Sequence, residues 1–370
     1  MKDALIKKCL SLVLLLVSLS LVACHLKGVN AEPRKPCALA VPANQAYTGA
    51  YIDFGDTEDD VTLKAIKDFE TLVGKHQAIV ASSSNWGKNS FPRHNVEIIT
   101  DYGAVPLIYW MPWISRADWD DHHIDRYTLC DILAGKYDDY LSRWADQARD
   151  FGQPLLVAWG IEMNGDWFPW SGFFYGAGAP APNGAAAGFA GPELYKRAYR
   201  HVVDQVRSRG AKNIQWVLHV NSGTIPPEKW NDFPNYYPGP DYVDWLGLSG
   251  YGQQYLNDTW WTVDDVFIST CKELTAVDPN KPIILAEWGI ANFPKAGNMG
   301  AWIAEALRRI PAECPQLHAA VYWHERWQNS DGSWSNLRVN ATAESLEAYR
   351  QGVASTFWRD HPLCAEQPHD

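Results

Sequence analysis

Residues 155–165 read LLVAWGIEMNG, an apolar run that ends on the carboxyl group of Glu162. A near-continuous apolar run of this length is typical of a strand in a parallel sheet that is covered on both faces. An ionisable side chain directly after such a strand is unfavourable in a packed core. The run therefore predicts a buried strand that ends at an open edge of the sheet.

Eight short apolar runs of this kind follow one another along the chain, at residues 49–54, 78–83, 105–110, 155–160, 214–220, 243–249, 283–287 and 319–323. Helical spacing of apolar residues occurs between them at 61–73, 137–149, 193–207, 262–274, 299–309 and 343–353. The helices after the second and fifth runs are less clear. Eight such units without a composition break favour an α/β protein with one domain, a (β/α)8 TIM barrel over residues 45–358, rather than a doubly wound sheet.

The composition excludes several classes of partner. The 370 residues are 46% hydrophobic and 20% charged, which is enough apolar material for a packed core. An excess of 43 Asp and Glu over 32 Lys and Arg gives a net charge of −11, which argues against nucleic acid and anionic membranes. The chain also has 19 Trp and 17 Tyr, whose flat amphipathic rings suit sugars. We therefore expect a neutral or cationic partner.

Residues 1–23 have the features of a secretory signal, with a basic start and a short apolar run at 10–23. The sequence LVAC at 21–24 also resembles the lipobox of bacterial lipoproteins, in which Cys24 becomes the lipidated first residue. An ordinary signal peptide with an incidental cysteine is the alternative. We expect an exported protein, either secreted or anchored to a bacterial membrane only through a lipid on Cys24.

The remaining segments are a linker at 24–44 and a C-terminal tail at 359–370. We expect a monomer. Five cysteines remain besides Cys9 and Cys24, and no two of them form a C-x-x-C pair, so neither a zinc site nor a dithiol motif is indicated. Some of the five can pair in an exported protein, with at least one left over, and the connectivity stays open.

Residues 120–123 read DDHH, which has the composition of a metal cluster. Adjacent side chains seldom converge on one ion, so we interpret this stretch as a solvated loop. No metal and no cofactor are expected.

Two carboxyl groups indicate the chemistry. Glu162 ends the fourth apolar run and Glu287 the seventh, and these strands lie across the mouth of an eight-stranded barrel from each other. Paired carboxyls that flank a sugar are the usual means of glycoside hydrolysis, in which one protonates the leaving oxygen and the other attacks the anomeric carbon or activates water. For either residue alone, a salt-bridged strand end is the alternative.

Three segments in order resemble glycoside hydrolase family 26, and the likeness spans residues 45–355. They are EMNGDWFPW at 162–170, YPGPDYVDWLG at 237–247 with the YG of 251–252, and AEWG at 286–289. This resemblance implies a retaining endo-β-glycanase on a (β/α)8 barrel. By position, it makes Glu162 the acid/base, Glu287 the nucleophile, Tyr251 a hydrogen-bond donor to the nucleophile, and Trp323 the aromatic floor at the cleavage point.

Further aromatic and polar groups near the expected strand ends are candidates for substrate binding, namely Trp110, Trp113, Asn164, Trp167, Trp170, His219 and Trp288. Core packing or a hydrophobic lid is the alternative for the tryptophans, a turn for Asn164, and a structural role for His219. Other polar strand-end groups include Asn221 and Glu325.

The chain departs from the family pattern at two positions. Ile161 stands where mannanases of the family commonly have His before the acid/base, and Ser249 stands where the family often has Asp. We expect hydrolysis of β-1,4-mannan, as by a mannan endo-1,4-β-mannosidase, with mixed-linkage β-1,3-1,4-glucan or β-1,3-xylan as alternative substrates. The residues also leave open a non-catalytic glycan-binding lipoprotein and an inverting or transglycosylating enzyme.

Overall fold

The computed structural model describes residues 37–115, 126–182 and 188–366. Its main sheet is parallel and closes on itself, because β2 pairs with β3 on one side and with β9 on the other. The eight barrel strands are β2 (Ala46–Tyr51), β3 (Ile79–Asn85), β4 (Val105–Met111), β5 (Leu155–Trp159), β6 (Ile214–Asn221), β7 (Trp245–Tyr251), β8 (Ile283–Gly289) and β9 (Leu317–Trp323). The predicted single-domain (β/α)8 TIM barrel is thereby confirmed.

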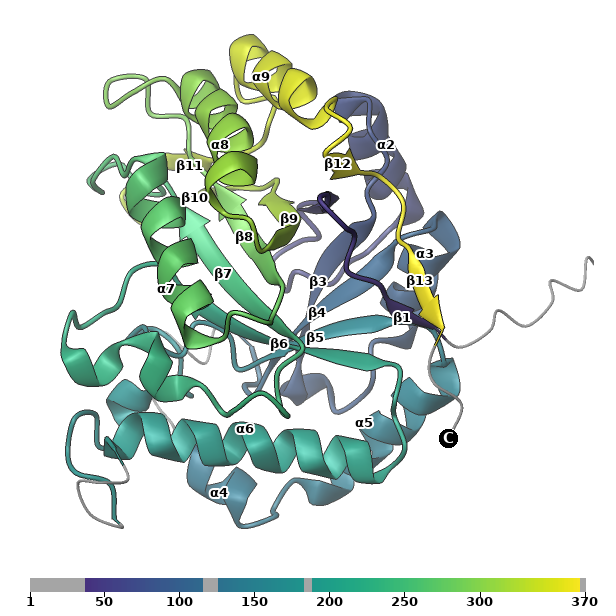
Figure 1. The fold of residues 1–370 in the computed structure, drawn as a ribbon, viewed down its shortest axis with the longest axis vertical. Coiled ribbons are helices and arrows are strands. Elements are labelled where there is room, and N and C mark those ends of the chain that lie inside the picture. Colours follow the sequence, from purple (N-terminus) through teal and green to yellow (C-terminus); the bar gives the residue numbers. More distant parts are fainter. Residues whose placement is uncertain (1–36, 116–125, 183–187, 367–370) are drawn as a thin grey trace, which may run out of the picture. The chain divides into compact units, whose positions relative to one another are not determined.

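Helices surround the strands on the outside, as Figure 1 shows. The α-helices are α2 (Leu63–Val73), α3 (Arg93–Tyr102), α4 (Leu129–Leu133), α5 (Asp138–Phe151), α6 (Ala190–Ser208), α7 (Ser269–Val277), α8 (Met299–Glu313) and α9 (Ala343–Val353). A π-helical turn at Asp264–Ile268 precedes α7. The connection from β6 to β7, described throughout, contains two short 3₁₀ helices, Lys229–Asn231 and Phe233–Tyr236, and no α-helix.

Helix α2 shows how local sequence sets these boundaries. The Thr62 side chain accepts a hydrogen bond from the backbone N–H of Ala65, which caps the helix start. Gly74 ends the helix in the left-handed conformation at φ 70°, which glycine adopts without a steric penalty. Ile66, Phe69 and Val73 lie on the buried face at helical spacing, so this side of α2 packs on the barrel.

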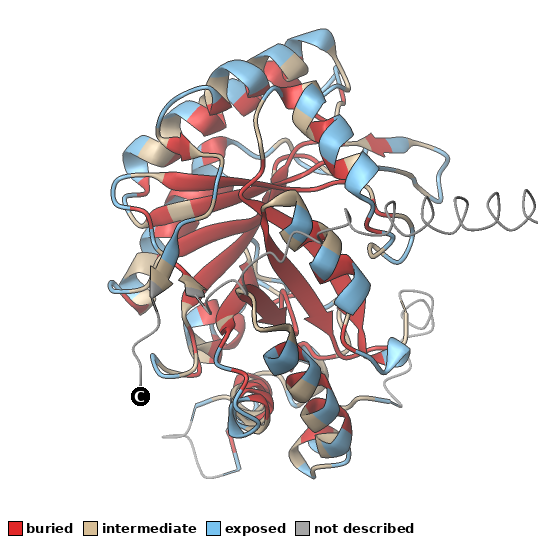
Figure 2. Cartoon of the chain, turned by 90° about the vertical axis from the view of Figure 1, so that its right-hand side faces the viewer, coloured by how far each residue is buried: buried red, intermediate tan, exposed pale blue. Residues whose placement is uncertain are grey.

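The core has two layers, one inside the barrel and one between the strands and the helices. Figure 2 shows the strands buried along their length, while the helices are buried on one side and exposed on the other. Successive side chains of a strand point to opposite faces of the sheet, so each strand supplies both layers. This alternation decides which strand residues reach the barrel mouth.

The segments that flank the barrel also contain strands. In the predicted linker and tail, β1 (Cys37–Leu39) pairs antiparallel with β13 (Cys364–Glu366). The short strand β12 (Trp358–Arg359) pairs parallel with β2, and β10 (Arg326–Gln328) forms a hairpin with β11 (Trp334–Asn336) after the last barrel strand.

A disulfide between Cys271 and Cys314 joins α7 to the end of α8, with 6.0 Å between the Cα atoms. Cys364 is also disulfide-bonded, and Cys130 is free and exposed. In the described ranges, no helix combines the length and apolarity that a membrane span requires. The predicted signal at 1–23, the lipidation site Cys24 and the DDHH stretch at 120–123 lie outside the described residues.

Candidate active site

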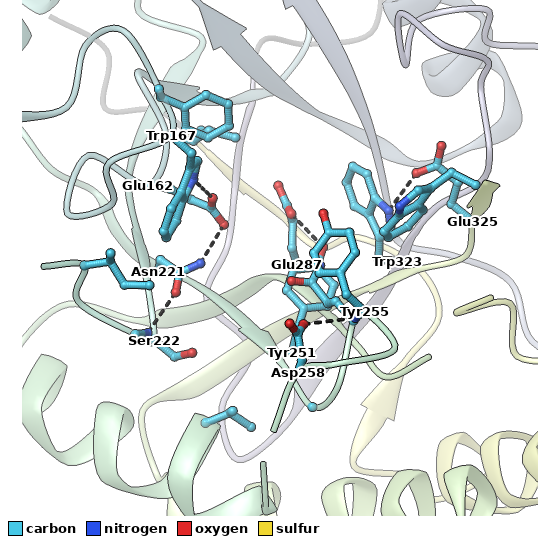
Figure 3. A pocket seen from close by; sticks show the side chains of 18 of the residues that line it. Glu162, Trp167, Asn221, Ser222, Tyr251, Tyr255, Asp258, Glu287, Trp323 and Glu325 are labelled. Carbon is cyan, nitrogen blue, oxygen red and sulfur yellow. Dashed lines mark hydrogen bonds between the residues drawn. The ribbon is translucent and has the colours of Figure 1, made fainter. Parts of the chain in front are cut away.

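A cavity of about 990 Å³ lies at the carboxyl ends of the barrel strands. Its wall includes both glutamates singled out from the sequence, Glu162 after β5 and Glu287 on β8. Figure 3 shows their side chains on two sides of the same space, with both carboxyl groups turned into it. Each residue is only 7% exposed. The fold therefore brings two nearly buried carboxyl groups from distant parts of the chain to one cavity.

Glu162 lies in a turn whose backbone is held by a hydrogen bond to strand β6. Its φ of 52° is in the left-handed region, which is uncommon for a residue with a side chain and is typical of functional turns. Its backbone N–H donates to the carbonyl of His219 at 2.7 Å. The carboxyl group accepts hydrogen bonds from Trp167 Nε1 at 2.8 Å and from Asn221 Nδ2 at 3.1 Å. The position of this carboxyl is therefore set by two donors.

A glycine makes one of these contacts possible. A Cβ on Gly165 would lie 2.5 Å from the ring of Trp167, closer than side-chain carbons approach each other. Only a residue without a side chain lets the Trp167 ring lie against the turn and direct its N–H at Glu162.

Glu287 is on the inner face of β8, and the hydroxyl of Tyr251 donates to its Oε2 at 2.7 Å. Ser249 of β7 is its partner in register on the neighbouring strand. Among the described residues, Glu287 thus has one side-chain donor where Glu162 has two.

The two carboxyl groups influence each other electrostatically. Burial raises the pKa of Glu287 well above its usual range, and the nearby charge of Glu162 raises it further. Burial also raises the pKa of Glu162, and its polar neighbours, which include the donors Trp167 and Asn221, oppose this effect. Because two close buried carboxylates repel each other, the pair retains one proton at a pH where isolated glutamates have none.

Asn164 acts on this site through the backbone. Its side chain is fully buried and exchanges two hydrogen bonds with the backbone of Asn221, both at 2.9 Å. Asn164 is absent from the cavity wall. It therefore fixes Asn221, which in turn donates to Glu162.

Aromatic rings line the cavity on both sides of the carboxyl pair. Three tryptophans predicted to bind substrate, Trp113, Trp167 and Trp323, are in the wall, together with Phe168. Trp323 stacks on Tyr51 with 3.9 Å between ring centroids, and its Nε1 donates to Glu325 at 2.8 Å. These two contacts fix the orientation of the Trp323 ring in the cavity wall.

Four other predicted substrate-binding residues do not reach the cavity. Trp110 is fully buried behind the sheet, where it stacks on Trp144 of α5. Trp288 follows Glu287 directly on β8, so it points to the opposite face of the strand. Trp170 donates its N–H to the carbonyl of Ile161, the residue before Glu162, and so helps to hold the turn.

His219 is the fourth of these residues. It is fully buried inside the barrel, and its Nε2 lies 2.6 Å from the hydroxyl of Ser249. These contacts support a structural role for His219, which is the alternative to substrate binding that the sequence leaves open.

Several residues of the cavity wall are not predicted from the sequence, because they lie on loops beyond the strand ends. The loop after β2 supplies Asp56 and Glu58, and the region after β7 supplies Tyr255, Asp258, Trp261 and Asp265. The acidic stretch DTEDD at 56–60 and the paired tryptophans at 260–261 are visible signals, but no spacing rule connects loop residues to a cavity.

The cavity wall is acidic. It contains seven carboxyl groups, those of Asp56, Glu58, Glu162, Asp258, Asp265, Glu287 and Glu325. Among the described residues that form this wall there is no Lys, Arg or His. Such a cavity repels anionic ligands and accommodates neutral or cationic ones. Among the described residues, no three or more His, Cys, Asp or Glu side chains are grouped so that they could hold a metal ion.

Comparisons with known proteins agree with this geometry. The sequence model of glycosyl hydrolase family 26 matches residues 102–293, a range that includes both glutamates. The chain is 32% identical to Endoglucanase H of Acetivibrio thermocellus over 295 residues, which are 79% of this chain and 29% of that protein. It is 28% identical to a mannan endo-1,4-beta-mannosidase of Bacillus subtilis over 191 residues, 50% of this chain and 44% of that one. The chain thus spans less than half the length of these relatives.

Solved structures share the fold at low sequence identity. The catalytic domain of an endo-beta-1,4-mannanase from Bacillus sp. JAMB-750 aligns with a TM-score of 0.59 and 18% identity, over 85% of this chain and 87% of that one.

Proposed function

The chain belongs to glycosyl hydrolase family 26, and from this premise we propose that it is a retaining endo-β-glycanase. The observation that carries the proposal is the pair of nearly buried carboxyl groups, Glu162 and Glu287, on the wall of one cavity at the barrel mouth. Two carboxyls that share a proton beside a bound sugar can act as acid and nucleophile in a double displacement.

In the first step Glu162 donates its proton to the glycosidic oxygen while the bond from that oxygen to the anomeric carbon breaks. The Glu287 carboxylate forms a bond to the same carbon, which gives a glycosyl-enzyme and releases one part of the polysaccharide. In the second step ionised Glu162 takes a proton from water, and the water oxygen displaces Glu287 from the anomeric carbon. The product then has the anomeric configuration of the substrate.

A bound sugar determines which carboxyl holds the shared proton. Before a sugar binds, the two donors at Glu162 favour its ionised form. A glycosidic oxygen placed against Glu162 favours the protonated form there, because that oxygen accepts a hydrogen bond. The positive charge that develops at the anomeric carbon favours an ionised Glu287. Substrate binding and bond cleavage thus draw the proton to Glu162.

We propose β-1,4-mannan as the substrate, in line with the mannanases among the relatives and the solved structures. A neutral polymer suits the acidic cavity wall, and its sugar rings can stack on Trp113, Trp167 and Trp323. Mixed-linkage β-glucan is the second candidate. It is favoured by the endoglucanase relative, which matches more of the chain at higher identity than the mannosidase does, and by Ile161 and Ser249.

The test is product analysis on galactomannan, glucomannan, lichenan and β-1,3-xylan, with proton NMR of the first anomer released. We expect short manno-oligosaccharides with retained configuration from the mannans, and gluco-oligosaccharides with retained configuration from lichenan if the second candidate is correct. An inverted first product would refute the double displacement. Binding to these polymers without release of reducing ends would show a glycan-binding lipoprotein instead.

We also propose that the protein is exported as a monomer and anchored by a lipid on Cys24. The disulfide between Cys271 and Cys314 supports an oxidising compartment. Expression of the full chain and of a Cys24→Ser variant tests the anchor. Wild type should fractionate with membranes and the variant should not, whereas equal distribution of the two would contradict the anchor.

A further inference from the structure

One loop residue of the cavity wall has a strained backbone. Glu58, in the loop between β2 and α2, has a φ of 56°, in the left-handed region that residues with a side chain rarely adopt. Among the described residues, seven that are not glycine have a positive φ, and of these only Glu58 and Glu162 line the cavity. Strain of this kind persists where the surrounding structure enforces it, and it is concentrated at functional sites. Glu58 thus shares an uncommon feature with the proposed acid/base.

Two hydrogen bonds from Ser83 of β3 hold Glu58 in this conformation. The backbone N–H of Ser83 donates to the carbonyl of Glu58 at 2.9 Å, and the Ser83 hydroxyl donates to Glu58 Oε2 at 2.5 Å. The loop is also closed on itself, because the N–H of Glu58 donates to the carbonyl of Gly55 at 2.8 Å. The carboxyl group of Glu58 is therefore fixed in the cavity wall before any ligand binds.

The order of the strands places Glu58 on one side of the cavity. Strand β2 lies between β3, which holds Glu58 through Ser83, and β9, which ends with Trp323. In the closed sheet, β2 and β3 lie opposite β6 and β7. Glu58 is therefore on the Trp323 side of the cavity, across from the loops that follow β6 and β7.

This side of the cavity faces the part of the polymer that stays on the enzyme. In the view of Figure 3, Glu287 lies between Glu162 and Trp323. In the proposed reaction the leaving part takes its proton from Glu162, while the glycosyl part remains on Glu287. Trp323 and Glu58 are therefore on the side of the retained glycosyl part. The charge of Glu58 also raises the pKa of Glu287, in line with this placement.

A fixed carboxylate on this side suits the hydroxyl groups of a neutral sugar. Hydrogen bonds to an ionised acceptor are shorter and stronger than those between neutral groups. A carboxylate has about four acceptor positions, so Glu58 can accept from sugar hydroxyls while Ser83 still donates to it. The described residues of the wall include no Lys, Arg or His, so no cation of the wall competes for this charge.

We propose that Glu58 binds hydroxyl groups of the second retained sugar unit, the neighbour of the unit that reacts at Glu287, and that Ser83 is its positioning residue. The inference rests on the proposed function. Trp323 on β9 is at the reacting unit, and the strand that holds Glu58 is two places further around the barrel. Two strand spacings amount to roughly 10 Å, which a single sugar ring does not span. Glu58 therefore selects for a second unit.

The test compares Glu58→Gln with Glu347→Gln, a matched change of an exposed glutamate on α9. The substrates are two dinitrophenyl glycosides of the sugar that the polymer assay identifies, one with a single sugar unit and one with two. For Glu58→Gln we expect kcat/KM to fall about tenfold on the two-unit substrate and less than about twofold on the one-unit substrate. Glu347→Gln should change neither. Equal falls on both substrates, as a merely structural role would give, or no fall on the two-unit substrate, would overturn the proposal.

Ser83→Ala tests the positioning of Glu58. The variant removes one of the two hydrogen bonds from Ser83, so kcat/KM on the two-unit substrate should fall in the same direction but less than in Glu58→Gln. Ser82→Ala is the matched control, because it removes the neighbouring buried serine, whose hydroxyl has no partner among the described residues. If Ser82→Ala behaves like Ser83→Ala, the positioning role of Ser83 is wrong.

A binding measurement separates this proposal from the proposed function. Calorimetric titration of Glu287→Ala with mannotetraose and with a mixed-linkage glucan tetrasaccharide gives Kd without cleavage. Addition of Glu58→Gln should raise Kd about tenfold, and addition of Glu347→Gln should leave it unchanged. An unchanged Kd in the Glu58→Gln protein would overturn the proposal. If wild type binds these oligosaccharides but cleaves no polymer, the proposed function fails, and this comparison still decides the role of Glu58.

Discussion

The two faces of strand β8 have different surroundings, although the residues on them are neighbours in the sequence. Glu287 points into the cavity, where it meets Tyr251 and the charge of Glu162. Trp288, the next residue, points outward and packs edge-on against Tyr322 and near Trp302 of α8. One face holds a buried acid that opposes folding, and the other holds a large ring that favours it. Function and stability are thus separated by a single step along one strand.

This separation predicts that changes at Glu287 and Trp288 affect different measurements. Replacement of Glu287 by Ala should reduce polymer hydrolysis by roughly 10⁵-fold, the scale on which the loss of a catalytic nucleophile is felt. The folded state should persist, as circular dichroism would show. Glu347→Ala, on the exposed side of α9, is the matched control and should leave the rate unchanged. If Glu287→Ala retained its activity, the claim that the inward face of β8 serves catalysis would be wrong.

Trp288→Ala tests the other face. Loss of a buried tryptophan should lower the free energy of unfolding by about 3–5 kcal/mol, since it leaves a cavity between β8 and the helices. The rate per folded molecule should stay within about twofold of wild type, measured at a temperature where the variant is folded. A large fall in rate with unchanged stability would show that Trp288 serves the cavity after all.

Glu162→Ala sharpens the difference between the two acids. Loss of an acid/base group lowers rates by about 10²–10⁴-fold, and we expect this range on the polymer. On a dinitrophenyl glycoside the burst of released phenolate should remain, because that leaving group departs without a proton. If the burst is lost to the same degree as polymer hydrolysis, Glu162 does more than transfer a proton.

Glu287→Gln tests the claim that the cavity face opposes folding. A carboxyl whose pKa is higher in the folded than in the unfolded state binds its proton more tightly when folded. Its stabilising contribution is full below the unfolded pKa and is lost as the pH rises through the folded pKa. The variant should therefore be about 1–3 kcal/mol more stable than wild type at pH 7, and this gain should vanish near pH 4. Urea denaturation at both pH values measures it, and a variant less stable at pH 7 would contradict the prediction.

The smallest expected effect concerns the charge of the cavity wall. Carboxymethylated glucomannan should be cleaved several times more slowly than the uncharged polymer at low salt, because seven carboxyl groups repel it. Added salt should reduce the difference by screening. A ratio that does not change with salt would point to steric exclusion instead.

The fold was largely predictable from the sequence, because eight apolar runs of strand length mark the eight barrel strands. Because Glu162 directly follows one of these runs, its position at the open edge of the sheet was also predictable. Helix α3 and the two 3₁₀ helices after β6 were not predictable, since polar residues interrupt the apolar spacing there.

The site was predictable only where strand position decides the direction of a side chain. The residue types of Trp110 and Trp288 suit sugars and so predict a place in the site, but alternation along the strand turns both side chains to the helical layer. The partnership of His219 with Ser249 depends on the register of β6 and β7, which no single strand encodes. Asp258 and Trp261 reach the cavity through a loop whose path is set by tertiary packing.

The most direct test of the central claim is to trap the glycosyl-enzyme. Wild type incubated with an activated 2-deoxy-2-fluoro glycoside, digested and analysed by mass spectrometry, should have one sugar attached to Glu287. Glu162→Ala should be labelled at the same residue, and Glu287→Ala should not be labelled. A sugar attached to Glu162, or no covalent adduct together with an inverted product, would contradict the account.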